Sequence, residues 1–150
     1  MPKRTLIVIL LFIVLLSAGC GKIHFGLIDG YYTAEAAEFD DFGWKEYLTI
    51  CVSGGKIILV EYNAYNSSGF IKSWDMDYMR VMNAADGTYP NAYTRHYGAL
   101  FLKHQGLDGI DALSGASHSY LVFTSLAEAV LENAQTGNSK TALVQFGELH

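Results

Sequence analysis

The chain has 150 residues, of which 51% are hydrophobic, 13% aromatic and 17% charged, and its formal net charge is −5. This composition is typical of one globular domain and excludes an intrinsically disordered protein, which would contain fewer aromatic residues. Because only one long apolar run occurs, a multi-pass membrane protein is excluded. The acidic balance makes nucleic acid an unsuitable partner, and two cysteines are too few for a disulfide scaffold.

The first 19 residues have the pattern of a lipoprotein signal peptide. Lys3 and Arg4 precede an apolar run from Leu6 to Leu16, which is too short for a stable transmembrane helix. The sequence Leu-Ser-Ala-Gly-Cys at 16–20 resembles a bacterial lipobox. The resemblance implies cleavage before Cys20 and lipidation of this cysteine, which would anchor the protein at the outer face of the bacterial cytoplasmic membrane. An ordinary signal peptide with a chance cysteine is the alternative.

The rest of the chain predicts strands first and helices afterwards. Alternating apolar residues favour strands at 31–39, 44–52 and 57–65, and the last two are joined by a hairpin signal at 53–56. With the second cysteine, Cys51, in the middle strand and Cys20 lipidated, we interpret Cys51 as a buried unpaired thiol.

Helical periodicity then begins. The predicted N-cap of the first helix is Ser73, and its apolar stripe is formed by Trp74, Tyr78, Val81 and Met82. Thr88 and Pro90 open a second helix, which carries on one side Tyr93, Tyr97, Leu100, Phe101 and His104, and a third helix covers 119–135. The expected fold class is therefore α+β, a small antiparallel sheet covered by about three helices. The predicted organisation is a signal peptide (1–19), a lipidated tether (20–28), one domain (29–137) and a weakly patterned C-terminal tail (138–150).

The candidate functional motif lies at residues 111–119, which read Asp-Ala-Leu-Ser-Gly-Ala-Ser-His-Ser and lead into the third helix. Gly115 and Ala116 leave backbone N–H groups uncovered, and hydroxyl groups come from Ser114, Ser117 and Ser119. Because helix N-termini with exposed amides bind anions, the segment suits a phosphate. A serine-capped helix start without any ligand is the alternative.

The same stretch resembles the flavinylation motif of FMN-binding domains, Asp-x-x-Ser/Thr-Gly-Ala-Thr/Ser. Such domains occur in the sodium-translocating quinone reductase, in the Rnf complex and in bacterial electron-transfer lipoproteins. The motif falls on Asp111, Ser114, Gly115, Ala116 and Ser117. Asp29-Gly30-x-Tyr32, the strand hairpin and Glu128-Ala129-x-Leu131-x-x-Ala134 match as well, so the resemblance covers residues 29–137.

The resemblance implies that a flavin transferase joins FMN through its phosphate to Ser117, with Asp111, Ser114, Gly115, Ala116 and Ser119 forming the rest of the site. The family's acceptor is usually threonine, and serine offers the same hydroxyl. The implied role is an electron carrier supplied by a membrane electron-donor complex, rather than an enzyme with its own substrate. A non-redox surface lipoprotein that binds a ligand or metal, and a flavin-dependent reductase of a small soluble acceptor, are the alternatives.

Other side chains are candidates to contact the flavin. Lys72 could approach the phosphate or the ring, or could simply be solvated. The isoalloxazine ring needs an apolar or aromatic slot, and six aromatic residues are candidates for it or for the core: Trp44, Tyr47, Tyr62, Trp74, Tyr78 and Tyr120. We predict no metal site, because His96, His104 and His118 lack the spacing of metal ligands. We also predict no catalytic residue.

Overall fold

The structure is a computed structural model that describes residues 26–146. The predicted signal peptide, Cys20 and most of the tether lie outside these residues. In the part of the chain that is described, no helix combines the length and the apolar character that a membrane span requires.

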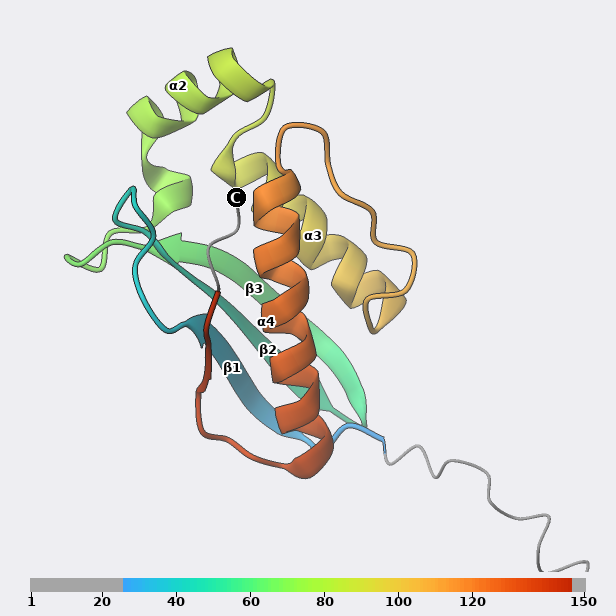
Figure 1. Cartoon of the computed structure of the whole chain (residues 1–150). Helices are drawn as coiled ribbons and strands as arrows, with labels where there is room; N and C mark the ends of the chain where they lie inside the picture. The colour runs from blue at the N-terminus through green and yellow to red at the C-terminus, as the bar shows by residue number, and fades with distance from the viewer. Residues whose placement is uncertain (1–25, 147–150) are drawn as a thin grey trace, which may run out of the picture.

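Four strands form one sheet in the order β3-β2-β1-β4 (Figure 1). The strands are β1 (Gly30–Ala36), β2 (Lys45–Ser53), β3 (Lys56–Tyr65) and β4 (Ala142–Val144). The first three are antiparallel neighbours, as predicted, and the β2–β3 hairpin turns at 54–55. The structure corrects the prediction for the tail, because β4 pairs in parallel with β1 and makes the sheet mixed. Three residues are too few to show a strand period, so β4 has no signal in the sequence.

Helices follow β3 along the chain. They are the 3-10 helix η1 (Lys72–Trp74) and the α-helices α2 (Met76–Asp86), α3 (Pro90–His104) and α4 (Ser117–Thr136). Helix α3 packs on β3, and α4 packs on β1 and β2, so that these two helices cover one face of the sheet (Figure 1). The predicted α+β class with three helices is confirmed.

The core lies between this face of the sheet and the two helices. Leu48, Ile50 and Val52 point into it from β2, as the alternation predicts, and Cys51 is buried. Tyr93, Tyr97 and Phe101 form the buried stripe of α3, whereas His104, which we also placed on that side, is exposed. From α4 the core receives Val122, Phe123, Leu126, Ala127 and Val130.

Helix α2 differs most from the prediction. Its expected apolar stripe is wrong at Trp74 and Val81, whose side chains are 66% and 72% exposed. Tyr78 and Met82 are half-buried, and α2 contains no fully buried residue. The predicted cap is also wrong: Ser73 is buried in η1, and the side chain of Asp75 accepts the capping hydrogen bond from the Tyr78 N–H at 2.9 Å. Periodicity indicated a helix correctly but could not show that α2 lies beyond the sheet, where no layer covers it (Figure 1).

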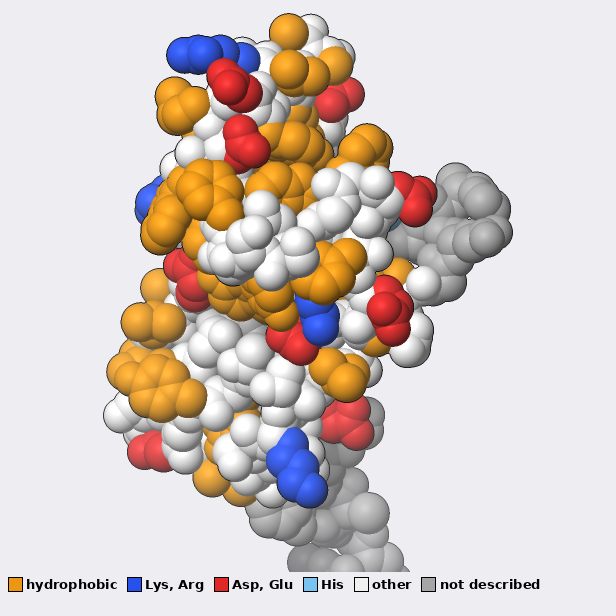
Figure 2. Space-filling view, turned by 90° about the vertical axis from the view of Figure 1, so that its left-hand side faces the viewer, with side chains coloured by type: hydrophobic (Ala, Val, Ile, Leu, Met, Phe, Trp, Pro, Cys, Tyr) orange, Lys and Arg blue, Asp and Glu red, His pale blue; other side chains and the backbone are white. Residues whose placement is uncertain are grey.

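Exposed hydrophobic side chains are numerous on the side of the molecule seen in Figure 2. Phe42 lies in the loop before β2, and Phe70 and Trp74 come after β3; all three are exposed. Phe70 and Trp74 pack edge to face with ring centroids 6.4 Å apart.

The N-terminal segment joins the domain at the far end of α4. The Ile28 N–H donates a hydrogen bond to the Ala134 carbonyl at 2.8 Å, close to the last turn of this 20-residue helix. At 1.5 Å per residue, the two ends of α4 are about 30 Å apart. The last residue of the predicted tether and the predicted flavin acceptor therefore lie at opposite ends of one helix.

Candidate functional site

The predicted motif forms the loop between α3 and α4, and its acceptor is the first residue of the helix. Helix α4 begins at Ser117, two residues before the predicted start. Ser114 and Ser117 are exposed, whereas Ala116 and Ser119 are buried. Ser117 therefore offers its hydroxyl to solvent, while the backbone around it is fixed by packing.

The N-terminus of α4 has no side-chain cap among the described residues. Its N-cap is Ala116, which has no hydrogen-bonding side chain, and the Ala116 N–H donates to the Leu113 carbonyl at 2.9 Å. The N–H groups of Ser117, His118 and Ser119 have no acceptor within their own helix, because each N–H of an α-helix bonds to a carbonyl four residues earlier. The first N–H with such a partner is that of Tyr120, which donates to the Ala116 carbonyl. These donors and the positive end of the helix dipole suit an anion attached at Ser117.

Gly115 brings the loop against the end of α2. Its φ is +76°, in the left-handed region, and a Cβ built on it would lie 2.1 Å from the Asp86 carbonyl oxygen. A side chain at this position would therefore collide with backbone. The small residue of the motif is required here by a close backbone contact as well as by its conformation.

The hydroxyl groups of two tyrosines, Tyr97 and Tyr120, form hydrogen bonds with the backbone of the loop. The hydroxyl of Tyr97 accepts a hydrogen bond from the Leu113 N–H at 2.9 Å and donates one to the Ala116 carbonyl at 3.2 Å, and burial raises the pKa of Tyr97. The hydroxyl of Tyr120 donates to the Ile110 carbonyl at 2.9 Å. Tyr97 thus joins the two sides of the turn that carries Ser114 and Gly115.

Sequence reasoning placed Tyr97 only in the core and missed this role. The signal is a tyrosine, rather than phenylalanine, at a core position of a helix, because a buried hydroxyl needs a polar partner. Tyr120 was a candidate for stacking on the flavin, and the structure instead gives its hydroxyl a partner in the loop.

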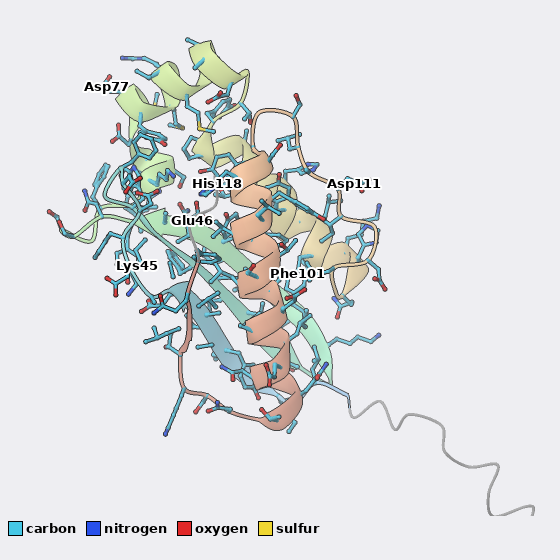
Figure 3. The ribbon with its side chains drawn as sticks, viewed as in Figure 1. Lys45, Glu46, Asp77, Phe101, Asp111 and His118 are labelled. Carbon is cyan, nitrogen blue, oxygen red and sulfur yellow. The ribbon has the colours of Figure 1, made fainter. Side chains whose placement is uncertain are left out.

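Asp111, the first residue of the motif, lies apart from the acceptor. Its side chain is exposed, and its carboxylate has no hydrogen-bond partner within residues 26–146. Figure 3 shows it on the loop before α4, away from the first turn of the helix, where His118 lies. The structure therefore brings together Ser114, Gly115, Ala116 and Ser117, and among the described residues Asp111 makes no hydrogen bond to them.

A buried polar network lies under the first turn of α4. Lys72 and Glu46 are only 5% and 7% exposed, and Lys72 Nζ is 4.0 Å from Glu46 Oε1. The hydroxyl of Tyr62 contacts Glu46 Oε2 and lies 3.0 Å from the Ser119 carbonyl oxygen. Figure 3 shows Glu46 beside the end of α4 that carries His118. The network therefore connects β2, β3 and η1 to the helix start.

Protonation of Glu46 determines how the network is hydrogen bonded. Burial raises the pKa of Glu46, and this effect is opposed by the Lys72 ammonium and by the Tyr62 hydroxyl. Burial also raises the pKa of Tyr62 well above its ordinary value, so its hydroxyl keeps its single proton. With Glu46 ionised, Tyr62 donates to the carboxylate; with Glu46 protonated, the carboxyl can donate to Tyr62, which then donates to the Ser119 carbonyl.

Aromatic rings surround the buried ammonium. Lys72 Nζ lies 5.2 Å from the ring centroid of Tyr78 and 5.9 Å from that of Trp44, within the range of cation–π attraction. The two rings pack edge to face with centroids 5.8 Å apart. Lys72 is therefore buried between aromatic rings, so the solvated alternative is wrong, whereas an approach of Lys72 to the phosphate or the ring remains a prediction.

The six aromatic candidates divide into two groups. Trp44, Tyr62 and Tyr78 belong to the Lys72–Glu46 network described above. The other three are separate from it: Tyr47 packs against Tyr65 on the uncovered face of the sheet, Trp74 is exposed, and Tyr120 bonds the loop.

Within the described residues no group of three His, Cys, Asp or Glu side chains could hold a metal ion. His96, His104 and His118 are all exposed.

No protein-family model matches the chain. The 15 kDa lipoprotein of Treponema pallidum (strain Nichols) is 33% identical over 115 residues, which cover 77% of this chain and 82% of that protein. The crystal structure of the CPE2226 protein from Clostridium perfringens is 38% identical, with a TM-score of 0.77, and the match covers 81% of this chain and 99% of that one. These similarities support the fold and the lipoprotein part of the prediction; the flavin remains a prediction.

Proposed function

This chain belongs to the family of the 15 kDa lipoprotein of Treponema pallidum, and on this premise we propose that it is a lipid-anchored flavoprotein. In this proposal FMN is esterified to Ser117, Cys20 carries the lipid, and the flavin relays electrons outside the cytoplasmic membrane from a membrane electron-donor complex. A flavin transferase is the partner required for the modification.

The observation that carries the proposal is the exposed Ser117 hydroxyl at the uncapped start of α4. A phosphodiester at this atom retains one negative charge, which the free N–H groups of the first turn and the helix dipole stabilise. The donor set therefore fits the phosphate of FMN. Ser119 is buried and its carbonyl faces Tyr62, so it is the poorer acceptor of the two.

The residues around Ser117 would keep the attachment point in place. Tyr97 fixes both sides of the loop, and the contact of Gly115 with Asp86 holds the loop against the end of α2. When bound, FMN supplies reversible acceptance of electrons, a chemistry that none of these side chains provides.

The point at which the N-terminal segment joins the domain is compatible with a relay. The Ile28 N–H bonds to the Ala134 carbonyl, so the chain enters the domain at the end of α4 opposite to Ser117. Ser117, the proposed attachment point, lies about 30 Å from this entry point along the helix. A covalent bond prevents loss of the cofactor by diffusion outside the membrane.

Intact mass after co-expression with a flavin transferase in the exported compartment tests the proposal. The ester forms with net loss of one water, so wild type and Ser117→Thr should gain the mass of FMN less water and fluoresce in a denaturing gel. Ser117→Ala should show neither, and Ser119→Ala, the matched control two residues away, should behave as wild type. Absence of the adduct in every form would contradict the proposal and favour the non-redox lipoprotein.

A further inference from the structure

Strand β3 forms one edge of the sheet, beside α3 (Figure 1). The outer strand of a sheet presents a row of backbone N–H and C=O groups that no neighbouring strand pairs. In an antiparallel pair, successive residues direct these groups alternately toward the neighbouring strand and away from it. The residues of β3 that direct them outward therefore decide whether this edge can bind another chain.

The two ends of this edge are closed by the protein itself. At the start of β3, the Ile57 N–H donates to Gln105 Oε1 at 2.8 Å and the Ile57 carbonyl accepts from Gln105 Nε2 at 2.9 Å, so a side-chain amide takes the place of a strand. Near the other end, the Ala64 N–H donates to the side-chain oxygen of Asn63 at 3.1 Å. Only the middle of the edge is left for another chain.

The middle of the edge is open. The Asn66 N–H donates to the Phe70 carbonyl at 3.0 Å, so Ala64 and Asn66 both direct their N–H groups away from β2. The alternation gives Val60 and Tyr62 the same outward direction, because the irregularity of the β2–β3 pairing lies nearer the hairpin. Within the described residues, the backbone groups of these two residues have no hydrogen-bond partner across the edge. Their N–H and carbonyl groups are thus available to an additional strand.

A cavity lies against this open stretch. Its volume is about 260 Å³, and residues 60–63 line it together with residues of η1 and α3. On the helix side, Gly98 lines the cavity without a side chain, and a Cβ built on it would lie 3.6 Å from Val60 Cγ1. The helix therefore leaves space beside the strand for the side chains of a bound segment.

Two exposed charges line the same cavity, those of Glu61 and Arg95. Arg95 Nε donates to Asn91 Oδ1 at 2.8 Å, and Glu61 Oε1 accepts from Asn63 Nδ2 at 3.1 Å. Among the ion pairs of residues 26–146 neither charge takes part. A ligand that carries both an acidic and a basic group could therefore pair with each of them.

We propose that this edge is a peptide-binding site: an extended segment of a partner protein adds to the sheet beside β3 and pairs with the main chain of Val60 and Tyr62. In this mode of recognition, main-chain hydrogen bonds supply affinity and alternating side chains supply specificity. A basic side chain opposite Glu61 and an acidic side chain on the α3 side, at Arg95, match the charges of the cavity. The site goes beyond the proposed function and does not depend on the flavin.

A second copy of the chain does not fit these charges. A symmetric antiparallel pairing of two β3 edges through Val60 and Tyr62 would place the two Glu61 residues directly opposite each other. Like charges in that position destabilise a strand pair. The occupant is therefore a different polypeptide, with a positive charge at the central position.

The experiment uses the mature lipoprotein in detergent and a probe peptide, Thr-Val-Asp-Lys-Asp-Val-Thr, blocked at both ends and labelled with a red dye. The charge pattern of this peptide is the same in either strand direction, with lysine opposite Glu61 and aspartates on the α3 side. We expect saturable binding by fluorescence anisotropy. The control peptide is N-methylated at both aspartates, which removes the two N–H donors that would pair with β3, and it should bind at least tenfold more weakly.

Glu61→Lys tests the charge at the centre of the edge. It should weaken binding of the lysine peptide about two- to fivefold, and it should strengthen binding of a peptide with glutamate in place of lysine by a similar factor. Glu128→Lys, the same change at an exposed position of α4, should alter neither affinity. Arg95→Glu should weaken binding of both peptides, whereas Arg80→Glu on α2 should not.

Amide hydrogen exchange, measured by NMR, locates the bound peptide. We expect the peptide to slow exchange at Val60 and Tyr62. Absence of saturable binding, equal affinity for the N-methylated peptide, or binding without slower exchange at these two residues would overturn the inference. A protein that is dimeric without peptide and already has these two amides protected would also overturn it, because a second copy would then occupy the edge. None of these measurements requires the flavin, so failure of the proposed function leaves this test unchanged.

Discussion

Gly115 lies so close to Asp86 that a Cβ on the glycine would be 2.1 Å from the aspartate's carbonyl oxygen. Asp86 is the last residue of α2, the helix that contributes no buried side chain, and Gly115 lies in the turn before α4. The contact therefore joins the outlying helix to the loop that carries the proposed flavin acceptor.

Gly115→Ala should destabilise the protein and reduce its flavin content. Alanine in the left-handed region costs about 1–2 kcal/mol, and the collision with Asp86 adds to this cost because backbone atoms must move. The free energy of unfolding in urea measures the effect. Gly109→Ala is the control, since Gly109 has a similar φ of +77° but its Cβ would lie 3.4 Å from a side-chain atom of His104. Equal losses in the two variants would show that the contact with Asp86 has no consequence.

Tyr97→Phe should loosen the loop while leaving the core packing intact. The change removes the partner of the Leu113 N–H and of the Ala116 carbonyl, and loss of these buried hydrogen bonds should cost about 1–3 kcal/mol. Tyr120→Phe, which removes one hydrogen bond to the same loop, should cost less. Urea unfolding gives the stabilities, and the yield of the FMN adduct shows whether the transferase still finds Ser117 in place. A Tyr97→Phe protein that is as stable as wild type contradicts this role.

Local features of the sequence predicted much of the fold. The three antiparallel strands followed from alternation and from the glycine turn, and the buried side of α3 followed from its tyrosines and Phe101. The parallel pairing of β4 with β1 could not be predicted, because it depends on where the chain returns in space and not on a pattern of three residues.

The candidate site was only partly predictable for the same reason. Ser114, Gly115, Ala116 and Ser117 are contiguous, so one motif identifies the whole turn. The Lys72–Glu46–Tyr62 network draws on η1, β2 and β3, and its members meet only in the folded protein. The roles of Tyr97 and Asp86 in supporting the loop are likewise set by packing between elements distant in sequence.

The stability of the protein should depend on pH through Glu46. Burial raises the pKa of this carboxyl in the folded state above its ordinary value of 4.5, so between the two pKa values the folded state binds more protons than the unfolded state. The contribution of Glu46 to the free energy of unfolding therefore falls as the pH rises from 4.5 through the folded-state pKa. Relative to wild type, Glu46→Gln should become more stable over this interval.

Urea unfolding at several pH values measures this difference. Glu128→Gln, which replaces an exposed carboxylate on α4, serves as the control and should follow the profile of wild type. A Glu46→Gln profile parallel to that of wild type would mean that Glu46 does not titrate differently on folding.

Cys20→Ser should abolish lipidation. In a lipobox the cysteine thiol is the attachment point for the diacylglycerol, so the variant should accumulate as an unprocessed precursor that incorporates no labelled fatty acid. Cys51→Ser is the matched control, because Cys51 is buried in β2 and should have no part in anchoring. Labelling that persists in Cys20→Ser would contradict the anchor.

The central claim is that Ser117 carries FMN, and the most direct test is the mass of the peptide that contains Ser117, taken from the mature protein purified from its native host. We predict a peptide that is heavier by FMN less one water, with the modification on the Ser117 side chain and a yellow protein before digestion. A protein that is fully processed and lipidated at Cys20, yet yields only the unmodified Ser117 peptide, would contradict the account.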